Sequence, residues 1–487
     1  MKCTRFLSLM LLVGMLAACG EAPAPAGDDT TAAADTTTAA PETTALTSAN
    51  YLDEYDFGGA TYHILGREYA KLGTLPSIEF DVEEENGDLI NDTIYRRNRK
   101  VEEQYNVVIE AETCAQNAVI GLVEKSQMAG DGAYDLVWAH INQMTSLCMK
   151  GLLSDYNQMP VIDIEKPWWN QLATESLTVN GRCYLQMNYI PFTGVMLSHC
   201  IYYNKALAED NGIDGLYELV ESGDWTFDAF ASAAKKVSRD VDGNGTYDDN
   251  DIYGFICSHG TAGACATGMG SKKPLDIKPD GSFDLIMVSD RNQSVVEMLI
   301  DLTTDVCTYL ITDYSLENDL AIMFSEGKAL FYSGFLTDSY QFFRNMDDDF
   351  GLLPFPKFDK TQKNYITTVT GGTGLLGIPK VVNNPELVGV VTEALAIESL
   401  NDIYPAIYET VFNDKLLRDE ESQRMFDILM SGMEIDFGRT YKHTAYSDVI
   451  STLIAEGATT LASSAEALEA AARDHYASVI ELFYEEE

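Results

Sequence analysis

Basic residues are scarce in this sequence. The 32 Lys and Arg residues stand against 76 Asp and Glu residues, which gives a formal charge of −44 at pH 7. A surface of this sign repels phosphate backbones, so we expect no nucleic-acid partner. High net charge favours solubility but does not identify any other partner.

Short catalytic motifs are absent as well. The chain has no HExxH and no GxSxG motif, and Gly372–Gly377 leads to Ile378 rather than to the Lys-Ser/Thr of a phosphate-binding loop. We therefore expect no enzyme. A surface glycoside hydrolase is the alternative, because 76 acidic residues leave room for a catalytic carboxylate pair. An adhesin is disfavoured by the lack of internal repeats.

The apolar run at the N-terminus is too short for a permanent membrane helix. It extends from Phe6 to Ala18, whereas a stable span needs about 20 residues. Lys2 and Arg5 precede the run, and it ends at Leu16-Ala-Ala-Cys19-Gly20. These features predict a signal peptide over residues 1–18 and a lipid on Cys19.

Residues 19–50 lack the apolar side chains that a core requires. From Glu21 to Asn50 there are ten Ala, eight Thr and three Pro, with one Leu and no aromatic residue. Such a segment cannot bury enough surface to offset the entropy lost on ordering. We expect a disordered tether between Cys19 and a folded body that begins near Tyr51.

Cysteine pairs with redox or metal-site spacing are also missing. Seven cysteines follow Cys19, and none forms a CxxC motif. A long chain with 46% hydrophobic residues can build its core without disulfides. We expect mostly free, buried thiols at Cys114, Cys148, Cys183, Cys200, Cys257, Cys265 and Cys307.

After Tyr51, short β-rich runs alternate with helical runs, which predicts an α/β sheet of parallel strands covered by helices. Ligands bind such sheets beyond the carboxyl ends of the strands, so the loops after Leu65 and Val137 are where a site is expected. The predicted strands are Ala60–Leu65, Val107–Ala111 and Tyr134–Trp138, and the predicted helices include Ile94–Tyr105, Ala118–Met128 and Leu147–Leu153.

A series of motifs follows the order found in a known family. They are Gly130–His140 with Lys150–Leu153, Gly181–Tyr184, Tyr203–Lys205, Phe324–Ala329 with Gly334–Phe335, Phe350–Pro354, and Gly371–Thr373. In this series the chain resembles the extracellular solute-binding proteins of ABC importers, a family that includes maltose-binding protein. Asp414–Ser422 and Asp436–Gly438 are similar to its clostridial lipoprotein branch.

The resemblance implies a two-lobed, periplasmic-binding-protein-like α/β fold. Each lobe would be a mostly parallel sheet flanked by helices, and a hinge would let the lobes close on a ligand. Residues 51–190 and 354–404 would form lobe 1, and residues 191–353 and 405–487 would form lobe 2.

The implied function is capture of a sugar or oligosaccharide and its delivery to ABC permease subunits. The protein would be a monomer without a catalytic cofactor, held by its lipid on the outer face of the cytoplasmic membrane of a single-membrane bacterium. An amino acid, a peptide or a polyamine remains an alternative ligand.

A sugar pocket needs flat aromatic rings and fixed hydrogen-bonding side chains. Trp138 and Phe335 are the leading candidates for stacking, and Trp168 with Trp169 could floor an extended site. For each of these rings, a place in the core is the competing interpretation.

The polar candidates lie at the ends of predicted strands and in the motifs of the resemblance. Arg67 and Glu68 could bind hydroxyls, although a surface ion pair is the competing interpretation. Ile141 and Asn142 replace the acid and base that follow this stretch in maltose-binding protein, so maltodextrin specificity is not implied. The remaining candidates are His140, Asn142, His259, Gly371 and Gly372.

Residues 240–251 have the spacing of an EF-hand calcium loop. Gly245 stands at position 6, where the loop must bend sharply, and a strand is predicted to follow in place of the second helix. We expect an isolated loop that holds a structural calcium ion, with a solvated acidic turn as the alternative. The expected ligands are Asp240, Asp242, Asn244, Thr246, Asp248 and Asp251.

Overall fold

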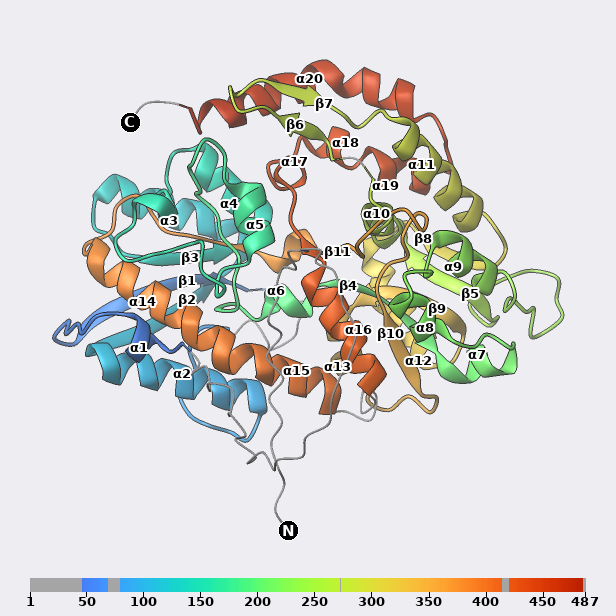
Figure 1. The fold of residues 1–487 in the computed structure, drawn as a ribbon, viewed down its shortest axis with the longest axis horizontal. Helices are drawn as coiled ribbons and strands as arrows, with labels where there is room; N and C mark the ends of the chain where they lie inside the picture. The colour runs from blue at the N-terminus through green and yellow to red at the C-terminus, as the bar shows by residue number, and fades with distance from the viewer. Residues whose placement is uncertain (1–45, 69–78, 272, 414–419, 485–487) are drawn as a thin grey trace, which may run out of the picture. The chain divides into compact units, whose positions relative to one another are not determined.

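The computed structural model describes residues 46–68, 79–271, 273–413 and 420–484 (Figure 1). Residues Met1–Ala45 form a separate unit from Leu46–Glu487. The predicted signal peptide, Cys19 and most of the predicted tether therefore lie outside the described residues.

The first sheet has the strand order β12-β3-β1-β2. Strands β2 and β3 run parallel to β1, whereas β12 is antiparallel to β3. Figure 1 shows helices α2 and α14 on one side of these strands and α3 and α4 on the other. The bounds are β1 (Ala60–Arg67), β2 (Val107–Cys114), β3 (Leu136–Ala139), β12 (Leu375–Gly377), α2 (Leu89–Tyr105), α3 (Val119–Ala129), α4 (Ile141–Met149) and α14 (Pro385–Glu398).

The second sheet has the order β10-β4-β9-β5-β8. The pairs β5–β8 and β5–β9 are parallel, and the pairs β4–β9 and β4–β10 are antiparallel. Its elements are β4 (His199–Asn204), β5 (Tyr253–Ser258), β8 (Thr308–Ile311), β9 (Ala329–Phe335) and β10 (Phe350–Leu353), with α7 (Lys205–Asp210), α9 (Phe227–Ala234), α10 (His259–Gly268), α12 (Glu317–Ser325) and α13 (Leu336–Gln341).

The chain passes between the two sheets three times. It crosses between β3 and β4, returns between β10 and β12, and crosses again through α14 and α15 (Tyr404–Asn413). In the third connection a π-helix, η7 (Ser399–Ile403), interrupts the helical path. Such π-helical insertions are rare and often occur at functional sites.

The C-terminal part adds a helical layer, drawn in red at the top of Figure 1. It contains α17 (Phe437–Thr440), α18 (Thr444–Ser447), α19 (Val449–Glu456) and α20 (Leu461–Glu481), near α11 (Asp290–Thr303) and the hairpin of β6 (Leu275–Ile277) and β7 (Phe283–Leu285). The other elements are α1 (Ser48–Tyr51), α5 (Gln171–Leu177), α6 (Thr193–Met196), α8 (Leu216–Glu221), α16 (Glu420–Ser431), β11 (Thr367–Thr368), β13 (Met433–Glu434), η3 (Gln116–Ala118), η4 (Tyr156–Gln158), η5 (Tyr314–Leu316) and η6 (Gly371–Thr373).

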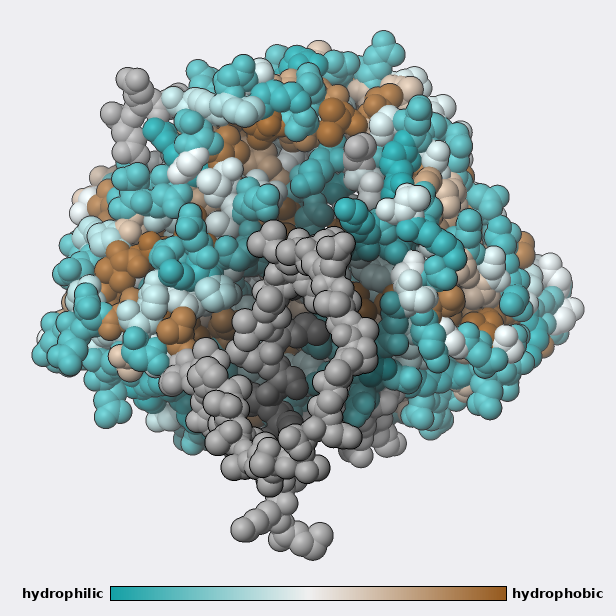
Figure 2. All heavy atoms as spheres, in the orientation of Figure 1, coloured by the Kyte–Doolittle hydropathy of each residue, from teal (hydrophilic) through white to brown (hydrophobic). Residues whose placement is uncertain are grey.

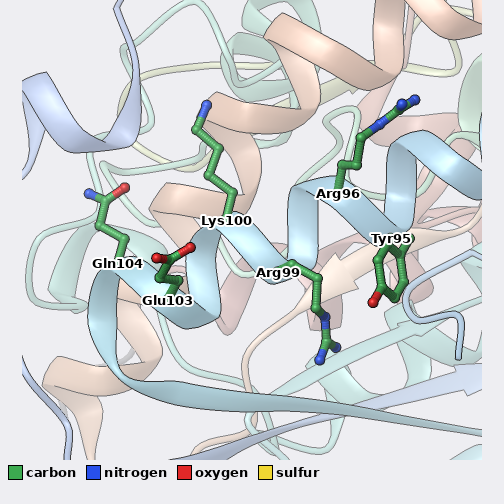
Figure 3. A pocket seen from close by; sticks show the side chains of 6 residues that line it. All are labelled: Tyr95, Arg96, Arg99, Lys100, Glu103 and Gln104. Atoms are coloured by element: carbon green, nitrogen blue, oxygen red, sulfur yellow. The ribbon is translucent and has the colours of Figure 1, made fainter. Parts of the chain in front are cut away.

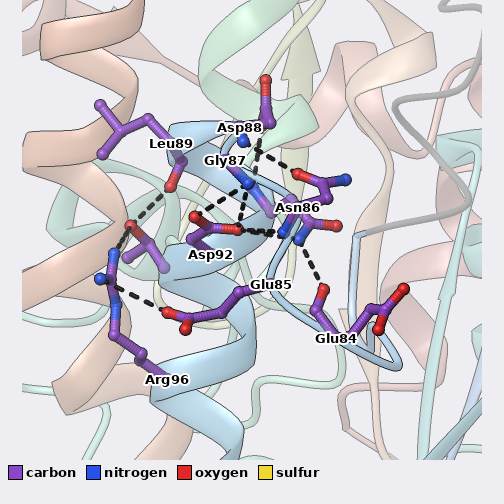
Figure 4. Close-up of polar contacts among 10 residues, drawn as sticks. Glu84, Glu85, Asn86, Gly87, Asp88, Leu89, Asp92 and Arg96 are labelled. Atoms are coloured by element: carbon purple, nitrogen blue, oxygen red, sulfur yellow. Dashed lines mark hydrogen bonds and ion pairs between the residues drawn. The ribbon is translucent and has the colours of Figure 1, made fainter.

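Several hydrogen bonds and an ion pair cluster at the start of helix α2 (Figure 4). The side chain of Asp88 caps the helix by accepting from the amide of Asn91 at 3.0 Å. One turn into the helix, Asp92 accepts from the amides of Asn86 and Gly87. These bonds satisfy backbone donors at the helix start and fix the loop that leads into it.

The predicted fold class is confirmed: two α/β sheets are flanked by helices. Both sheets are mixed, however. In the first sheet β12 pairs antiparallel with β3, and in the second sheet β4 pairs antiparallel with both β9 and β10. The predicted helix Leu147–Leu153 is wrong in its extent. Helix α4 ends at Met149, and Gly151 takes a left-handed φ of 65° that a helix cannot continue.

The state of the cysteines and the polarity of the surface are as the composition predicts. All seven cysteines after Cys19 are free, and all but the partly buried Cys114 are buried, as predicted. Figure 2 shows a mainly hydrophilic face with small apolar patches. No helix in the described part of the chain is long and apolar enough to cross a membrane.

Candidate functional site

Strand β1 ends at Arg67. The side chain of Arg67 is fully buried and contacts two other segments of the chain. Its Nη1 donates to Oε1 of Gln116 at 2.7 Å, and its Nη2 donates to the carbonyl of Gly372. Its guanidinium carbon lies 4.9 Å from the centre of the Trp138 ring. Arg67 thus joins the ends of β1 and β3 to the loop at Gly372.

Trp138 lies on β3 and supports the same loop. Its Nε1 donates to the carbonyl of Thr373 at 3.2 Å, while Phe80 packs edge-on against its ring at 5.7 Å. Gly374 has a φ of 74°, and a Cβ there would lie 2.5 Å from Nε1 of Trp138. Only glycine permits this approach. Trp138 is fully buried, so its ring supports the Thr373–Gly374 loop from inside the protein.

His140 follows β3 and caps helix α4. Its Nδ1 accepts from the amide of Asn142 at 3.1 Å, so the neutral ring carries its proton on Nε2. Among the described residues, nothing is hydrogen-bonded to Nε2. Burial, reinforced by the positive charges of Arg67 and Lys442, lowers the pKa of His140 to about 4. The ring is therefore a neutral hydrogen-bond donor at pH 7.

The second sheet contributes an aromatic pair, His199 on β4 and Phe335 on β9. The two residues face each other across the antiparallel ladder, and their ring centres lie 4.9 Å apart. Nδ1 of His199 lies 3.1 Å from the carbonyl oxygen and 3.0 Å from Oγ1 of Thr368. The short segment from Thr368 to Gly371 therefore leads from this pair to His140.

We call the group formed by Arg67, Trp138, His140, Gly371, Gly372, His199 and Phe335 the Trp138 site. It lies beyond the carboxyl ends of β1 and β3, where the alternation of strands and helices predicts a site. Two exposed side chains lie close by in the sequence: Glu68 directly follows Arg67, and Asn142 lies two residues after His140.

Three predicted residues lie elsewhere. Trp168 and Trp169 are buried in the core, where their Nε1 groups donate to the two carboxylate oxygens of Glu393 at 2.8 and 3.1 Å. Their rings pack against Tyr51 and Tyr156 rather than at the Trp138 site. His259 starts α10, partly buried, with its ring centre 4.5 Å from that of Tyr314.

Sequence reasoning missed several members of the site and its surroundings. His199 stands at the start of a six-residue strand that is buried throughout, and that apolar run was a signal that could have found it. Glu79, Phe80 and Thr368 lie in segments without periodicity. Their place beside the site follows only from tertiary packing.

The predicted metal loop brings three carboxylates together. Oxygens of Asp240, Asp242 and Asp251 lie within 4.8 Å of one another, so this triad could hold a metal ion. The carboxylate of Asp240 accepts from the amides of Gly245 and Gly243, which lowers its pKa.

The other predicted ligands take part in turns of the same loop. Asn244 accepts from the amide of Thr246 at 2.6 Å, and Asp248 accepts from the amide of Asn250 at 2.9 Å. The buried Asp251 accepts from the amides of Val241 and Asp248, which closes the loop. Oxygen-rich ligands of this kind suit a hard cation such as calcium.

Two hollows lie away from the Trp138 site. One, of about 930 Å³, is bordered by α5, β6, β13, α17 and Tyr484, and the ion pairs of Lys273 with Glu434 and Asp436 lie at its wall. The other, of about 460 Å³, is an open groove on α2 (Figure 3). Its basic side chains are already paired, for example Arg99 with Glu102 at 2.8 Å.

Two mixed α/β sheets are flanked by helices, and the chain passes between them three times. The chain belongs to the family of bacterial extracellular solute-binding proteins, which it matches over residues 99–392, more than half of its length. No curated protein sequence matches it.

Solved structures of sugar-transport proteins share the fold. The sugar-binding protein MalE of Xanthomonas citri superposes with a TM-score of 0.58 at 10% identity, covering 88% of this chain and 100% of that one. The maltodextrin-binding domain MalE of Bdellovibrio bacteriovorus, bound to maltotriose, gives 0.52 at 14% identity, with 88% and 100% covered. An ABC substrate-binding protein of Listeria monocytogenes in complex with cycloalternan gives 0.52 at 14% identity, with 86% and 98% covered.

The family match settles the class of the protein. It is a bacterial extracellular solute-binding protein and not an enzyme, so the glycoside hydrolase alternative is set aside. The resemblance to the solute-binding family is confirmed at this level. At identities of 10–14%, the structural likeness shows the fold alone.

Proposed function

We propose that this protein is the lipid-anchored substrate-binding component of an ABC importer. It captures a sugar or oligosaccharide at the Trp138 site and delivers it to the permease subunits in the membrane. The ligands bound by its structural relatives, maltotriose and cycloalternan, support a saccharide. The clostridial lipoprotein branch of the family and a monomeric state belong to the same proposal.

One observation carries the choice of site: the neutral donor of His140 beside Gly371. Its Nδ1 is engaged by the Asn142 amide, and a Cβ on Gly371 would lie 2.9 Å from its Nε2. A fixed N–H beside bare backbone suits a ligand hydroxyl, because the hydroxyl can accept from the ring and approach the main chain closely. Charge is not required at either partner.

The rest of the site supports this role. Arg67 and Trp138 hold the Gly372–Thr373 loop from behind, through the bonds described above. Glu68 and Asn142 are exposed and can supply further hydrogen bonds. Phe335 is buried against His199, so its ring would meet the apolar face of a sugar only after the site opens. Closure of lobe 1 (51–190 and 354–404) on lobe 2 (191–353 and 405–487) would bring His140 and Phe335 onto one ligand.

A saccharide screen by thermal shift, followed by titration calorimetry, tests the proposal. At least one sugar or oligosaccharide should raise the melting temperature, and His140→Phe should weaken its binding by roughly tenfold or more through loss of one donor. His140→Gln retains an N–H and should bind more tightly than His140→Phe. Failure of every saccharide to stabilise the protein, with stabilisation by an amino acid, peptide or polyamine, would refute a sugar ligand.

The anchor and the metal complete the proposal. A lipid on Cys19 and a flexible tether over residues 19–50 would keep the binding lobes beside the permease of a single-membrane bacterium. A calcium ion held by Asp240, Asp242 and Asp251 would have a structural role. The close approach of these carboxylates, which repel one another without a cation, supports the ion.

A further inference from the structure

Arg97 is a buried charge in the middle of helix α2. Its side chain has no exposure, and among the described residues its hydrogen bonds go to uncharged oxygens. Burial lowers its pKa to about 10, opposed by the more distant charges of Glu79, Asp81 and Asp402. The group is still cationic at pH 7. Burial of a charge without an ion partner costs folding free energy.

The guanidinium of Arg97 joins three segments that are far apart in the sequence. Nη1 donates to the carbonyl of Ile190 at 3.2 Å and to Oγ of Ser399 at 3.1 Å. Nη2 donates to the carbonyl of Phe80 at 3.1 Å. Asn98 holds the fork in place by accepting from Nε at 3.0 Å and from Nη2 at 2.9 Å.

Each of these segments has a distinct place in the fold. Phe80 packs against the ring of Trp138, and a Cβ on Gly66 would lie 3.3 Å from the Phe80 ring. Ile190 lies in the first connection between the sheets, shortly before α6. Ser399 is the first residue of the π-helix η7 in the third connection.

A second buried group, Glu79, strengthens the same link. Its carboxylate accepts from the amide of Thr193 at 2.8 Å and from the hydroxyl of that residue. The next residue, Gly194, lies against the methyl group of Thr373, since a Cβ placed there would be 3.4 Å away. The pair Glu79–Phe80 therefore contacts the Trp138 site on one side and the first connection on the other.

We propose that Arg97 is a positioning residue for ligand binding, which couples the Phe80 segment behind Trp138 to the two connections at Ile190 and Ser399. A ligand that shifts Trp138 then also shifts the segments that link the sheets. The link from ligand to Trp138 rests on the proposed function, whereas the coupling itself is a property of the unliganded protein. Arginine suits this role because its planar guanidinium carries donors on separate nitrogens in a rigid fork, whereas the three donors of an ammonium group share one nitrogen.

Hydrogen exchange of the unliganded full chain, read by mass spectrometry, tests the coupling. Phe80→Leu loosens the packing on Trp138 with little loss of volume. It should raise the amide exchange rates of residues 399–403 by roughly tenfold. A change of this size corresponds to the loss of about one hydrogen bond. In an Arg97→Lys background the same substitution should add nothing at these residues.

Arg96→Lys is the matched control, because Arg96 precedes Arg97 on the helix, is exposed and pairs with Glu85 at 3.6 Å. In that background Phe80→Leu should keep its full effect. The proposal is overturned if the double variant shows an exchange rate equal to the product of the two single effects, because such a product means that Phe80 and Arg97 act independently.

Ser399→Ala provides a second test that keeps the buried charge and two of its three segments. It should abolish the response of residues 399–403 to Phe80→Leu. Residues 190–196, which Arg97 contacts through the carbonyl of Ile190, should still exchange faster when Phe80 is replaced by Leu. Equal responses in both segments would refute the path through Ser399. Absence of saccharide binding in the wild type would refute the proposed function and leave these exchange results standing.

Discussion

The imidazole of His140 lies directly against Gly371. A Cβ placed on Gly371 would be 2.8 Å from Cε1 and 2.9 Å from Nε2 of the ring, closer than side-chain atoms approach one another. Gly371 therefore shapes the Trp138 site although it has no side chain of its own. A methyl group at this position would have to displace the ring.

We expect Gly371→Ala to impair ligand binding more than stability. The added methyl pushes His140 from its place, and loss of its hydrogen bond should weaken binding by roughly tenfold or more. Titration calorimetry with the saccharide that stabilises the wild type measures the change. Gly121→Ala is the control: a Cβ there meets nothing within 4 Å, and alanine in helix α3 should stabilise by about 0.5–1 kcal/mol. Unchanged affinity in Gly371→Ala would contradict the assigned site.

Local patterns predicted most of the first sheet and the three carboxylates that gather in the acidic loop. The strands and helices around β1, β2 and α3 follow from hydrophobic periodicity. The acidic loop was predictable because its candidate ligands lie within residues 240–251 and are set by spacing alone. When all candidate ligands lie in one short segment, their spacing in the sequence is enough to predict that they come together.

Long-range contacts account for what the sequence could not reveal. Trp168 and Trp169 meet Glu393 across more than two hundred residues, so no local pattern distinguishes these core rings from a sugar platform. The antiparallel pairing of β12 depends likewise on a returning connection. His199 and Glu79 join the site through tertiary packing, which periodicity does not describe.

Glu393 should make stability depend on pH. Burial raises its pKa to about 7 from 4.5, because the charged form is poorly solvated beside Trp168 and Trp169. A raised pKa favours the folded state below pH 4.5, and this contribution is lost as the pH rises to about 7. By the ordinary conversion of pKa shift to free energy, it amounts to about 3 kcal/mol.

We expect Glu393→Gln to flatten this dependence. Denaturant unfolding between pH 4.5 and 7 should show a smaller slope than in the wild type, with stability at pH 5 reduced by about 1–3 kcal/mol because the amide cannot accept from both indoles. Glu386→Gln, an exposed change on the same helix, should leave the slope unchanged. Parallel curves for Glu393→Gln and the wild type would contradict the raised pKa.

Calcium should stabilise the protein through the Asp240 loop. At a concentration about one hundred times its Kd, an ion that binds only the folded state adds about 2.7 kcal/mol, which should raise Tm by a few degrees. Calorimetry of chelated protein with and without added calcium measures this. Asp240→Asn should abolish the shift, whereas Asp280→Asn, in the exposed turn between β6 and β7, should preserve it. Equal Tm values for the chelated and calcium-loaded wild type would eliminate the site.

Replacement of Cys19 tests where the protein acts. Without its thiol the N-terminus cannot receive a lipid, so Cys19→Ala should be released into the medium and should lose incorporation of labelled fatty acid. Saccharide affinity should be unchanged, because ligand binding belongs to the body after Leu46. Cys3→Ala, within the predicted signal peptide, should leave the protein on the cell. Retention of Cys19→Ala on cells with normal lipid labelling would mean that the anchor lies elsewhere, and the tether over residues 19–50 would then lose its proposed role.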